Sequence, residues 1–148
     1  MATKTQEAEN KAIVERFYEE LDSHNLGIMD ELLADEYTTG IYRSGSEAQL
    51  EGGRAGMKEL WQEYWEAFPD FEGKSMELIA EGDRIAVFRE ETGTHEGEFR
   101  GIAPTGNEVT FEYAGYFVVE DGQIVHGHFR GNMLNLLKQL GVEPPIPR

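Results

Sequence analysis

The sequence predicts an α+β protein in which helices come first and mostly antiparallel strands follow. From residue 8 to residue 68, apolar residues recur at the three- and four-residue spacing of amphipathic helices. From residue 74 onwards the pattern changes to short runs with alternating apolar and polar positions, which is typical of strands. The turn signals "EGD" and "EDG" separate neighbouring runs as hairpin loops do.

Three helices are predicted in the first half of the chain. The first covers residues 8–23 and ends at "DSHNLG", and the second is a short apolar stripe at residues 28–33. The third covers residues 57–68, and "FPD" ends it because proline disfavours helical geometry in the residue before it. Between the second and third helices, "TTGIYRSGSEAQLEGG" (residues 38–53) is interpreted as a polar connector.

Two strand pairs and a closing helix are predicted in the second half. "KSMELIA" and "RIAVFREETGTH" flank the first turn, and "EVTFEYAGYFVV" and "QIVHGHFR" flank the second, with "GIAPTGN" as a break between the pairs. "NMLNLLKQLG" (residues 132–141) reads as a short helix with Gly141 as its C-cap, which the proline-rich end cannot continue. We expect one domain over residues 1–148, with residues 1–7 and 142–148 flexible or extended.

The charge balance is strongly acidic, with 29 Asp and Glu against 13 Lys and Arg and a net charge of −16. Such a surface repels phosphate backbones and anionic lipids, so we expect neither nucleic acid nor membrane as a partner. One interpretation is simply a very soluble surface. A sharper hypothesis is adaptation to high salt, because counter-ions screen the repulsion that would otherwise destabilise the compact state.

Two absences narrow the function classes further. The chain has no cysteine, which excludes disulfides, thiol chemistry and cysteine-based zinc sites. It also has no apolar run of the length of a signal peptide or a membrane helix. We therefore expect a cytoplasmic protein.

The string "TGTHEGEFRGIAPTGNEVTF" (residues 92–111) resembles the SnoaL-like polyketide cyclases, also called ester cyclases, of the NTF2-like superfamily. Further matches follow the same order along the chain, among them "NKAIVERFYEEL", "DELLADEY", "AFPDFEG", "LIAEGDRIAV", "VEDGQIV" and "LLKQLG". The resemblance implies a cone-shaped α+β barrel, in which about three helices close the open end of a curved sheet around a pocket. It also implies a homodimer.

The resemblance implies a reaction as well, an intramolecular aldol closure of a small hydrophobic polyketide ester that needs no metal and no cofactor. In the family an acidic residue near the start of the last helix acts as acid and base. Here a gap-free alignment puts Asn132 at that position, and Thr39 and Gly40 stand where an Asp-His pair is common. A neutral amide cannot accept the proton. The alternatives are therefore a non-catalytic small-molecule binding protein, or a hydrolase or isomerase on the same scaffold.

A polar row in "VHGHFRGN" (residues 125–132) is the predicted catalytic site. If residues 125–132 continue as a strand, His126, His128, Arg130 and Asn132 point to one side. A histidine would then be the general base, and Arg130 and Asn132 would stabilise the oxyanion. An H-x-H pair can also bind a metal, but a third ligand would have to converge on it, and we expect no metal. A wet barrel rim or a dimer face is the remaining interpretation.

Candidate substrate contacts come from the aromatic faces of the predicted helices and from the strands. They are Tyr18, Trp61, Tyr64 and Tyr116, together with His95, which the resemblance implies is the family's histidine in the "TGTH" string. Core packing is the alternative for each aromatic residue.

Strand alternation limits which side chains can face the cone together. It sends Tyr113 and Tyr116 to opposite faces, and we expect Tyr116 to point into the cone with its neighbour Phe117 outward. It separates Glu90 from Glu91 in the same way. One of these two acids could be the buried carboxylate that Asn132 does not provide.

Overall fold

The computed structural model describes residues 3–43, 46–49 and 53–143. Its helices are α1 (Lys4–Asp22), α2 (Ile28–Leu32), α3 (Gly53–Ala67) and α4 (Met133–Gln139). Its strands are β1 (Leu33–Arg43), β2 (Ser46–Gln49), β3 (Glu72–Glu81), β4 (Arg84–Thr94), β5 (Glu108–Glu120) and β6 (Gln123–Gly131). Within these ranges no helix is long and apolar enough to cross a membrane.

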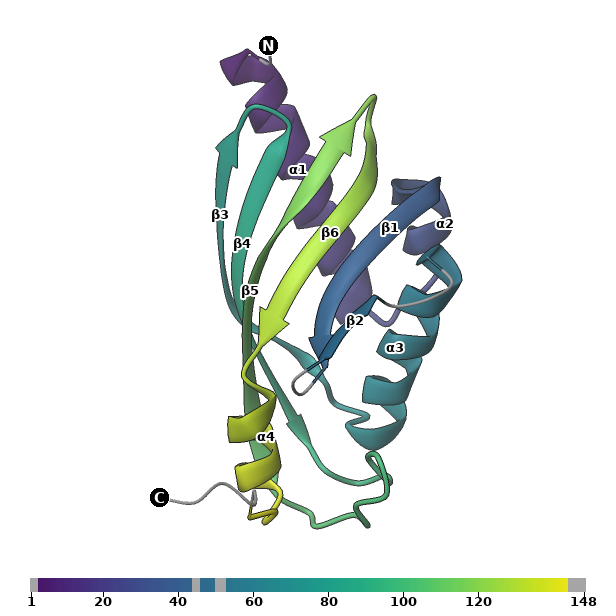
Figure 1. Cartoon of the computed structure of the whole chain (residues 1–148), viewed down its shortest axis with the longest axis vertical. Helices are drawn as coiled ribbons and strands as arrows, with labels where there is room; N and C mark the ends of the chain where they lie inside the picture. Colours follow the sequence, from purple (N-terminus) through teal and green to yellow (C-terminus); the bar gives the residue numbers. More distant parts are fainter. Residues whose placement is uncertain (1–2, 44–45, 50–52, 144–148) are drawn as a thin grey trace.

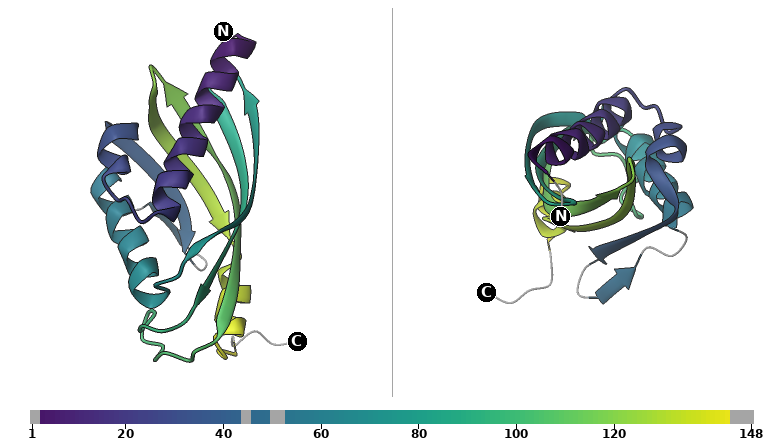
Figure 2. Two further views of the ribbon diagram at one scale, coloured as in Figure 1. Left: turned by 180° about the vertical axis from the view of Figure 1, so that it is seen from behind. Right: turned by 90° about the horizontal axis from the view of Figure 1, so that it is seen from above.

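The strands form one curved, unclosed sheet in the order β2-β1-β6-β5-β4-β3 (Figure 1). All neighbouring pairs are antiparallel except β1 and β6, which are parallel. Helices α1, α2 and α3 cover the concave face, while α4 lies beyond the end of β6 and beside β5 (Figure 2). The predicted α+β class and the cone shape are confirmed.

Helix α1 begins earlier than its apolar periodicity predicted. Thr3 and Gln6 form a capping box, in which Gln6 N–H donates to Thr3 Oγ1 at 3.1 Å and Thr3 N–H donates to Gln6 Oε1 at 2.9 Å. These bonds satisfy N–H groups that a helix start otherwise leaves open. Residues 4–7, expected to be flexible or extended, are therefore helical.

The predicted connector at residues 38–53 is wrong, because most of its described part is strand. β1 continues to Arg43 and pairs in parallel with β6, so that Thr38 lies opposite His126 and Gly40 opposite His128. Tyr37 and Thr39 are buried while Thr38 is exposed, which is the period-two alternation of a strand. Residues 44–45 and 50–52 of the connector lie outside the described residues.

The closing helix ends as predicted. Gly141 has a φ of +85° directly after the cap residue Leu140. Its N–H donates to Lys138 O at 3.0 Å, and Val142 N–H donates to Leu137 O at 2.9 Å. This pair of bonds is a Schellman motif, which favours glycine because the backbone must turn left-handed there.

The core fills the space between the concave face and the helices. Its centre is aromatic, with the rings of Phe17 and Phe117 in edge contact at 5.7 Å and those of Phe117 and Phe129 at 4.8 Å. On β4 the inward positions begin with Ile85 and Val87, as an apolar stripe should. The same stripe then continues with two charged residues, and these define the site.

Candidate active site

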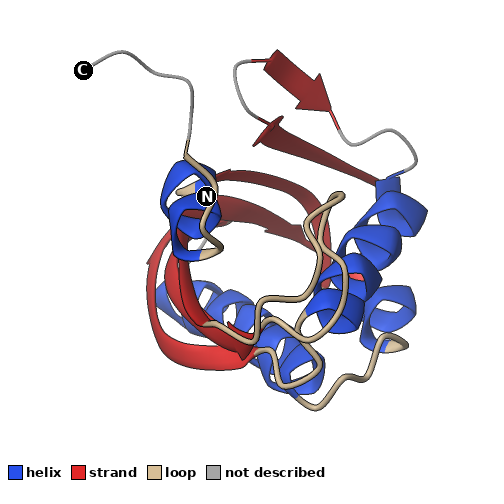
Figure 3. Ribbon diagram, turned by 90° about the horizontal axis from the view of Figure 1, so that it is seen from below, coloured by secondary structure: helices blue, strands red, loops and turns tan. Residues whose placement is uncertain are grey.

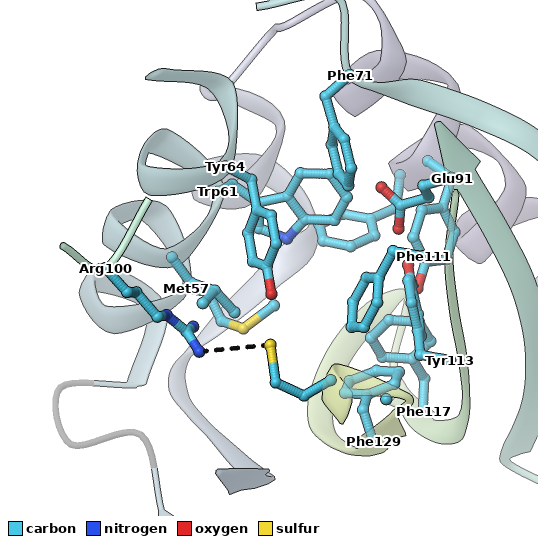
Figure 4. Close-up of a pocket in the computed structure, with 15 residues that line it drawn as sticks. Met57, Trp61, Tyr64, Phe71, Glu91, Arg100, Phe111, Tyr113, Phe117 and Phe129 are labelled. Atoms are coloured by element: carbon cyan, nitrogen blue, oxygen red, sulfur yellow. Dashed lines mark hydrogen bonds between the residues drawn. The ribbon is translucent and has the colours of Figure 1, made fainter. Parts of the chain in front are cut away.

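Seen from below, the sheet curves around with helices on its concave side (Figure 3). A cavity of about 90 Å³ lies between this concave face and helices α1 and α3 (Figure 4). Its walls are mostly aromatic, and include Tyr18, Trp61, Tyr64, Phe71, Phe111 and Phe117. A small number of polar groups also face it, chiefly Glu91, Tyr113 and Arg100. An apolar pocket with a few converging polar groups is the usual form of a small-molecule site.

Glu91 is the acid of this cavity. It occupies an inward position of β4 and is 1% exposed, and Figure 4 shows its carboxyl group among the aromatic rings. Among the described residues, its Oε2 atom has no hydrogen-bond partner. Burial raises the pKa of Glu91 to about 7, although the nearby Arg89 and a hydrogen bond with Tyr113 oppose the rise. The carboxyl group is therefore poised to exchange a proton near neutral pH.

Arg89 balances the charge next to Glu91. Its Nε atom lies 3.4 Å from Glu91 Oε1, and its Nη2 atom donates to Asp22 Oδ1 on α1. The guanidinium also lies over the ring of Tyr18, at 4.3 Å from the ring centre. Arg89 is 2% exposed, so these contacts hold a buried cation that would otherwise be costly.

Two tyrosine hydroxyls lie close to the Glu91–Arg89 pair. Tyr113 OH donates to Tyr18 OH at 3.0 Å, and both residues line the cavity. Burial raises the pKa of both hydroxyls above the ordinary value, so both keep their protons at neutral pH. Neutral phenols are donors that can stabilise a developing oxyanion in a water-poor site.

The predicted substrate contacts divide into two groups. Tyr18, Trp61 and Tyr64 line the cavity, so the helix faces were oriented correctly. His95 does not line it. This histidine is 0% exposed, accepts a bond from Thr105 N–H at its Nδ1 atom (3.1 Å), and packs against Phe68. These contacts tie down the loop that leads to β5.

Tyr116 has the reverse of its expected orientation. Phe117 is 0% exposed and lines the cavity, while Tyr116 lies on the outer face of the sheet. There its ring stacks with that of His128 at 5.8 Å and receives the guanidinium of Arg84 at 5.2 Å. Tyr113, on the same face of β5 as Phe117, supplies the tyrosine hydroxyl inside the cone.

The polar row of β6 does not meet the cavity. Inward positions of β6 are taken by Gly127 and Phe129, so His126, His128 and Arg130 lie on the outer face. There Thr38 Oγ1 and His126 Nδ1 are 2.8 Å apart. Asn132 is exposed and caps α4, accepting from Asn135 N–H at 3.1 Å. The structure therefore does not bring His128 and Asn132 to a common point in the cavity, and the catalytic role of this row stays a prediction.

No metal site emerges in the described part of the chain, where no group of three or more His, Asp or Glu side chains is arranged to hold an ion. Sequence reasoning missed Arg89, which pairs with both Glu91 and Asp22, and it missed Arg100, which lines the cavity. The sequence does contain a pattern that points to Arg89. In "RIAVFREE", the inward stripe that begins with apolar residues reaches Arg89 and then Glu91, an ion pair at strand spacing.

Comparison with known proteins agrees with the fold. Residues 12–140 match the family model of SnoaL-like polyketide cyclases. A comparison with curated proteins gives no significant match. Among solved structures, AclR, a proposed hydroxylase from Streptomyces galilaeus, is 27% identical with a TM-score of 0.83, over 96% of this chain and 91% of that one.

Two further solved structures have the same fold. IdmH, a proposed polyketide cyclase from Streptomyces antibioticus, is 26% identical with a TM-score of 0.77, over 90% of this chain and 99% of that one. A proposed SnoaL-like polyketide cyclase from Jannaschia sp. CCS1 is 21% identical with a TM-score of 0.82, over 97% and 99% of the two chains. At that identity the last likeness supports the fold alone.

Proposed function

Because the chain belongs to the SnoaL-like polyketide cyclase family, we propose that it is a cofactor-free enzyme in which Glu91 removes a proton from a carbon next to a carbonyl group. One observation carries the proposal. Glu91 is a carboxyl group with a pKa of about 7 in an apolar cavity, and one of its oxygens has no partner among the described residues. A base whose pKa lies near the working pH is the most effective kind.

The proposed reaction proceeds in two proton transfers. Ionised Glu91 takes the proton from the carbon, and the resulting enolate oxygen accepts a hydrogen bond from Tyr18, whose hydroxyl in turn accepts one from Tyr113. The enolate carbon then attacks a second carbonyl of the same molecule and forms the new carbon–carbon bond. The alkoxide so formed takes the proton back from Glu91. Atoms and charge balance without any other reactant.

The walls of the cavity support this chemistry by keeping it dry. Aromatic side chains from α1, α3 and the sheet surround the carboxyl group, and they fit a hydrophobic substrate. In such surroundings water competes little for the enolate, so the two tyrosine hydroxyls have a larger effect on its energy than they would in solution. The family's aldol-type cyclisation of a polyketide is the reaction we favour.

Deuterium washout from a simple ketone tests the proposal. The α-deuterated form of 2-tetralone, a small bicyclic ketone, loses its label to water when a base removes the proton reversibly. We expect the protein to accelerate washout and Glu91→Gln to slow it by roughly 10²- to 10⁴-fold. Glu90→Gln is the matched control, because Glu90 is the neighbouring acid on the opposite face of β4. Equal rates for the wild type and Glu91→Gln would refute the assignment.

A small-molecule binding protein without catalysis is the second candidate. Asn132 favours it, because an amide stands where the family places its acid. The same assay separates the two classes. A binding protein would bind 2-tetralone, seen as quenching of the fluorescence of Trp61 and Trp65, and leave the washout rate at that of buffer. A homodimer, a cytoplasmic location and the absence of nucleic-acid partners stay predictions.

A further inference from the structure

We propose that Arg100 selects substrates that carry a carboxylate at the solvent-facing end of the cavity. This inference rests on the proposed function, since it takes the cavity to be the substrate site. Figure 4 shows Arg100 on one side of the cavity and Glu91 on the other. The side chain of Arg100 is 30% exposed against 2% for that of Glu91, so Arg100 marks the end that meets solvent.

The backbone at Arg100 shows that the turn itself does not call for an arginine. Phe99 N–H donates to Ile102 O at 3.0 Å and Ile102 N–H donates to Phe99 O at 2.9 Å, which closes a two-residue hairpin. Arg100 and Gly101 both have positive φ, at +47° and +84°. This is the geometry of a type I′ turn, for which Asn-Gly is preferred. An arginine has a strained backbone in this position. We therefore infer that its side chain serves a function.

The turn is held in place, and this fixes the position of the guanidinium. Phe99 is 0% exposed and packs against Tyr64 and Phe68, each at 5.5 Å between ring centres. The guanidinium of Arg100 lies over the ring of Phe99 at 4.9 Å. The side chain is therefore supported on an aromatic base and does not need to be ordered when a ligand arrives.

The hydrogen bonds of Arg100 leave its outer nitrogens available. Nε donates to Glu63 Oε1 at 2.8 Å. Among the described residues, the thioether of Met133 is the one acceptor that the terminal nitrogens contact, with Nη1 at 3.8 Å from Sδ. A thioether is a weak acceptor, whereas a planar carboxylate fits the guanidinium fork with two bonds.

The charge of the whole protein leaves few places where an anion can bind. With a net charge of −16 the surface repels anions, and among the described residues that line the cavity Arg100 is the one cation. A substrate that matches both ends of the cavity has a flat hydrophobic body, a carboxylate at Arg100, and an activated C–H bond at Glu91. We therefore infer a free acid as the substrate class, in preference to its ester.

Paired ligands test this assignment. The probes are 2-naphthoate and its methyl ester, which share a ring system and differ in charge, and their dissociation constants are measured by calorimetry. We expect the wild type to prefer the acid by roughly 10- to 100-fold, the range for a charge-assisted pair. Arg100→Gln should lose that preference and keep its affinity for the ester. Arg16→Gln, which breaks a surface Arg–Glu pair and changes the net charge equally, should keep the preference.

Two further variants separate the possible roles. Glu63→Gln removes the carboxylate that competes for Arg100. This variant should therefore bind 2-naphthoate more tightly than the wild type does. If Arg100 and Glu63 were only a structural latch, both variants would weaken binding of both probes. Glu91→Gln should stop washout and still prefer the acid, so the two proposals fail independently. Equal binding of acid and ester by the wild type, or an unchanged preference in Arg100→Gln, would overturn the assignment, as would no saturable binding of the acid.

Discussion

At the scale of single residues, the environment of Glu91 decides what the site can do. A carboxylic acid is rarely buried, and here it is held among aromatic rings, where of the described residues only Arg89 and Tyr113 stabilise its charge. Arg89 in turn is shared with Asp22, so the compensation of Glu91 is incomplete. Glu91 can therefore act as a base near neutral pH. A carboxylate in a full ion pair could not, because the pair would lower its pKa.

Stability of the Glu91→Gln variant should depend on pH. The pKa of Glu91 is higher in the folded state than its ordinary value of 4.5, so the folded protein binds this proton more tightly than the unfolded chain does. The wild type therefore loses stability as pH rises from about 4.5 to about 7, by about 3 kcal/mol in total, and the loss is complete above pH 7. Glutamine does not ionise, so the variant does not lose this stability as the pH rises. We expect the variant to gain stability relative to the wild type above pH 7 and not at acidic pH, measured by urea unfolding.

Glu90→Gln provides the control for that measurement, because Glu90 lies on the other face of β4. Its stability difference from the wild type should change little with pH. If the stability difference between Glu91→Gln and the wild type were the same below pH 4.5 and above pH 7, Glu91 would titrate in the folded protein as it does in the unfolded chain.

The residue scale also shows where sequence reasoning stops. Alternation separated Glu90 from Glu91 and Tyr116 from Phe117, but it does not say which member of a pair faces inward. Hydrophobicity normally decides this, and here it gave no answer. The outer face carries a tyrosine beside His128 and Arg84, and the inner face carries Glu91. With amphipathic residues on the outer face and charged residues on the inner face, the two faces of the sheet differ little in hydrophobicity.

At the scale of elements, helix α4 explains the polar residue that stands at the family's acid position. Asn132 accepts from Asn135 N–H and so closes the first turn of the helix. Its side chain is exposed and is not part of the cavity wall. The acid of the proposed site comes from β4, a different element.

The capping role of Asn132 predicts the effect of two substitutions. Asn132→Ala should lower the free energy of unfolding by about 1 kcal/mol, because one N–H of the first turn loses its acceptor. Asn132→Asp should keep the stability, because a carboxylate caps equally well and suits the helix dipole. Chemical denaturation measures both. An Asn132→Ala variant with the same free energy of unfolding as the wild type would show that the cap does not contribute to stability.

The same scale shows which elements could be predicted. The helices and the two hairpins follow from periodicity and turn residues, because their contacts are largely local. β1 was missed because its parallel pairing with β6 joins Thr38 to His126, residues far apart in sequence. Gly40 is part of the reason. A Cβ atom there would lie 2.6 Å from His128 Nδ1, so a glycine that looked like a loop signal is needed for close strand contact.

At the scale of the whole molecule, charge and shape act in different places. The net charge of −16 belongs mostly to the exposed surface, while the interior acid Glu91 has Arg89 beside it. The resemblance read from the sequence predicted the cone and its pocket, which the structure has. It did not predict the position of the acid, since that depends on which strand face closes around the cavity.

Surface repulsion predicts a response of the whole fold to salt. Screening shortens the range of repulsion between exposed carboxylates to roughly 3 Å at molar ionic strength. We expect the melting temperature to rise steadily as KCl is added up to molar concentration, followed by circular dichroism. A melting temperature that does not respond to molar KCl would contradict the hypothesis of adaptation to high salt.

The pH dependence of deuterium washout from 2-tetralone tests the central claim, that Glu91 is the base, most directly. For the wild type we predict a rate constant that rises with pH and levels off above about 7, as Glu91 loses its proton. For Glu91→Gln we predict a low rate without that inflection, while Glu90→Gln follows the wild type. A Glu91→Gln variant that keeps both the wild-type rate and its inflection would contradict the claim.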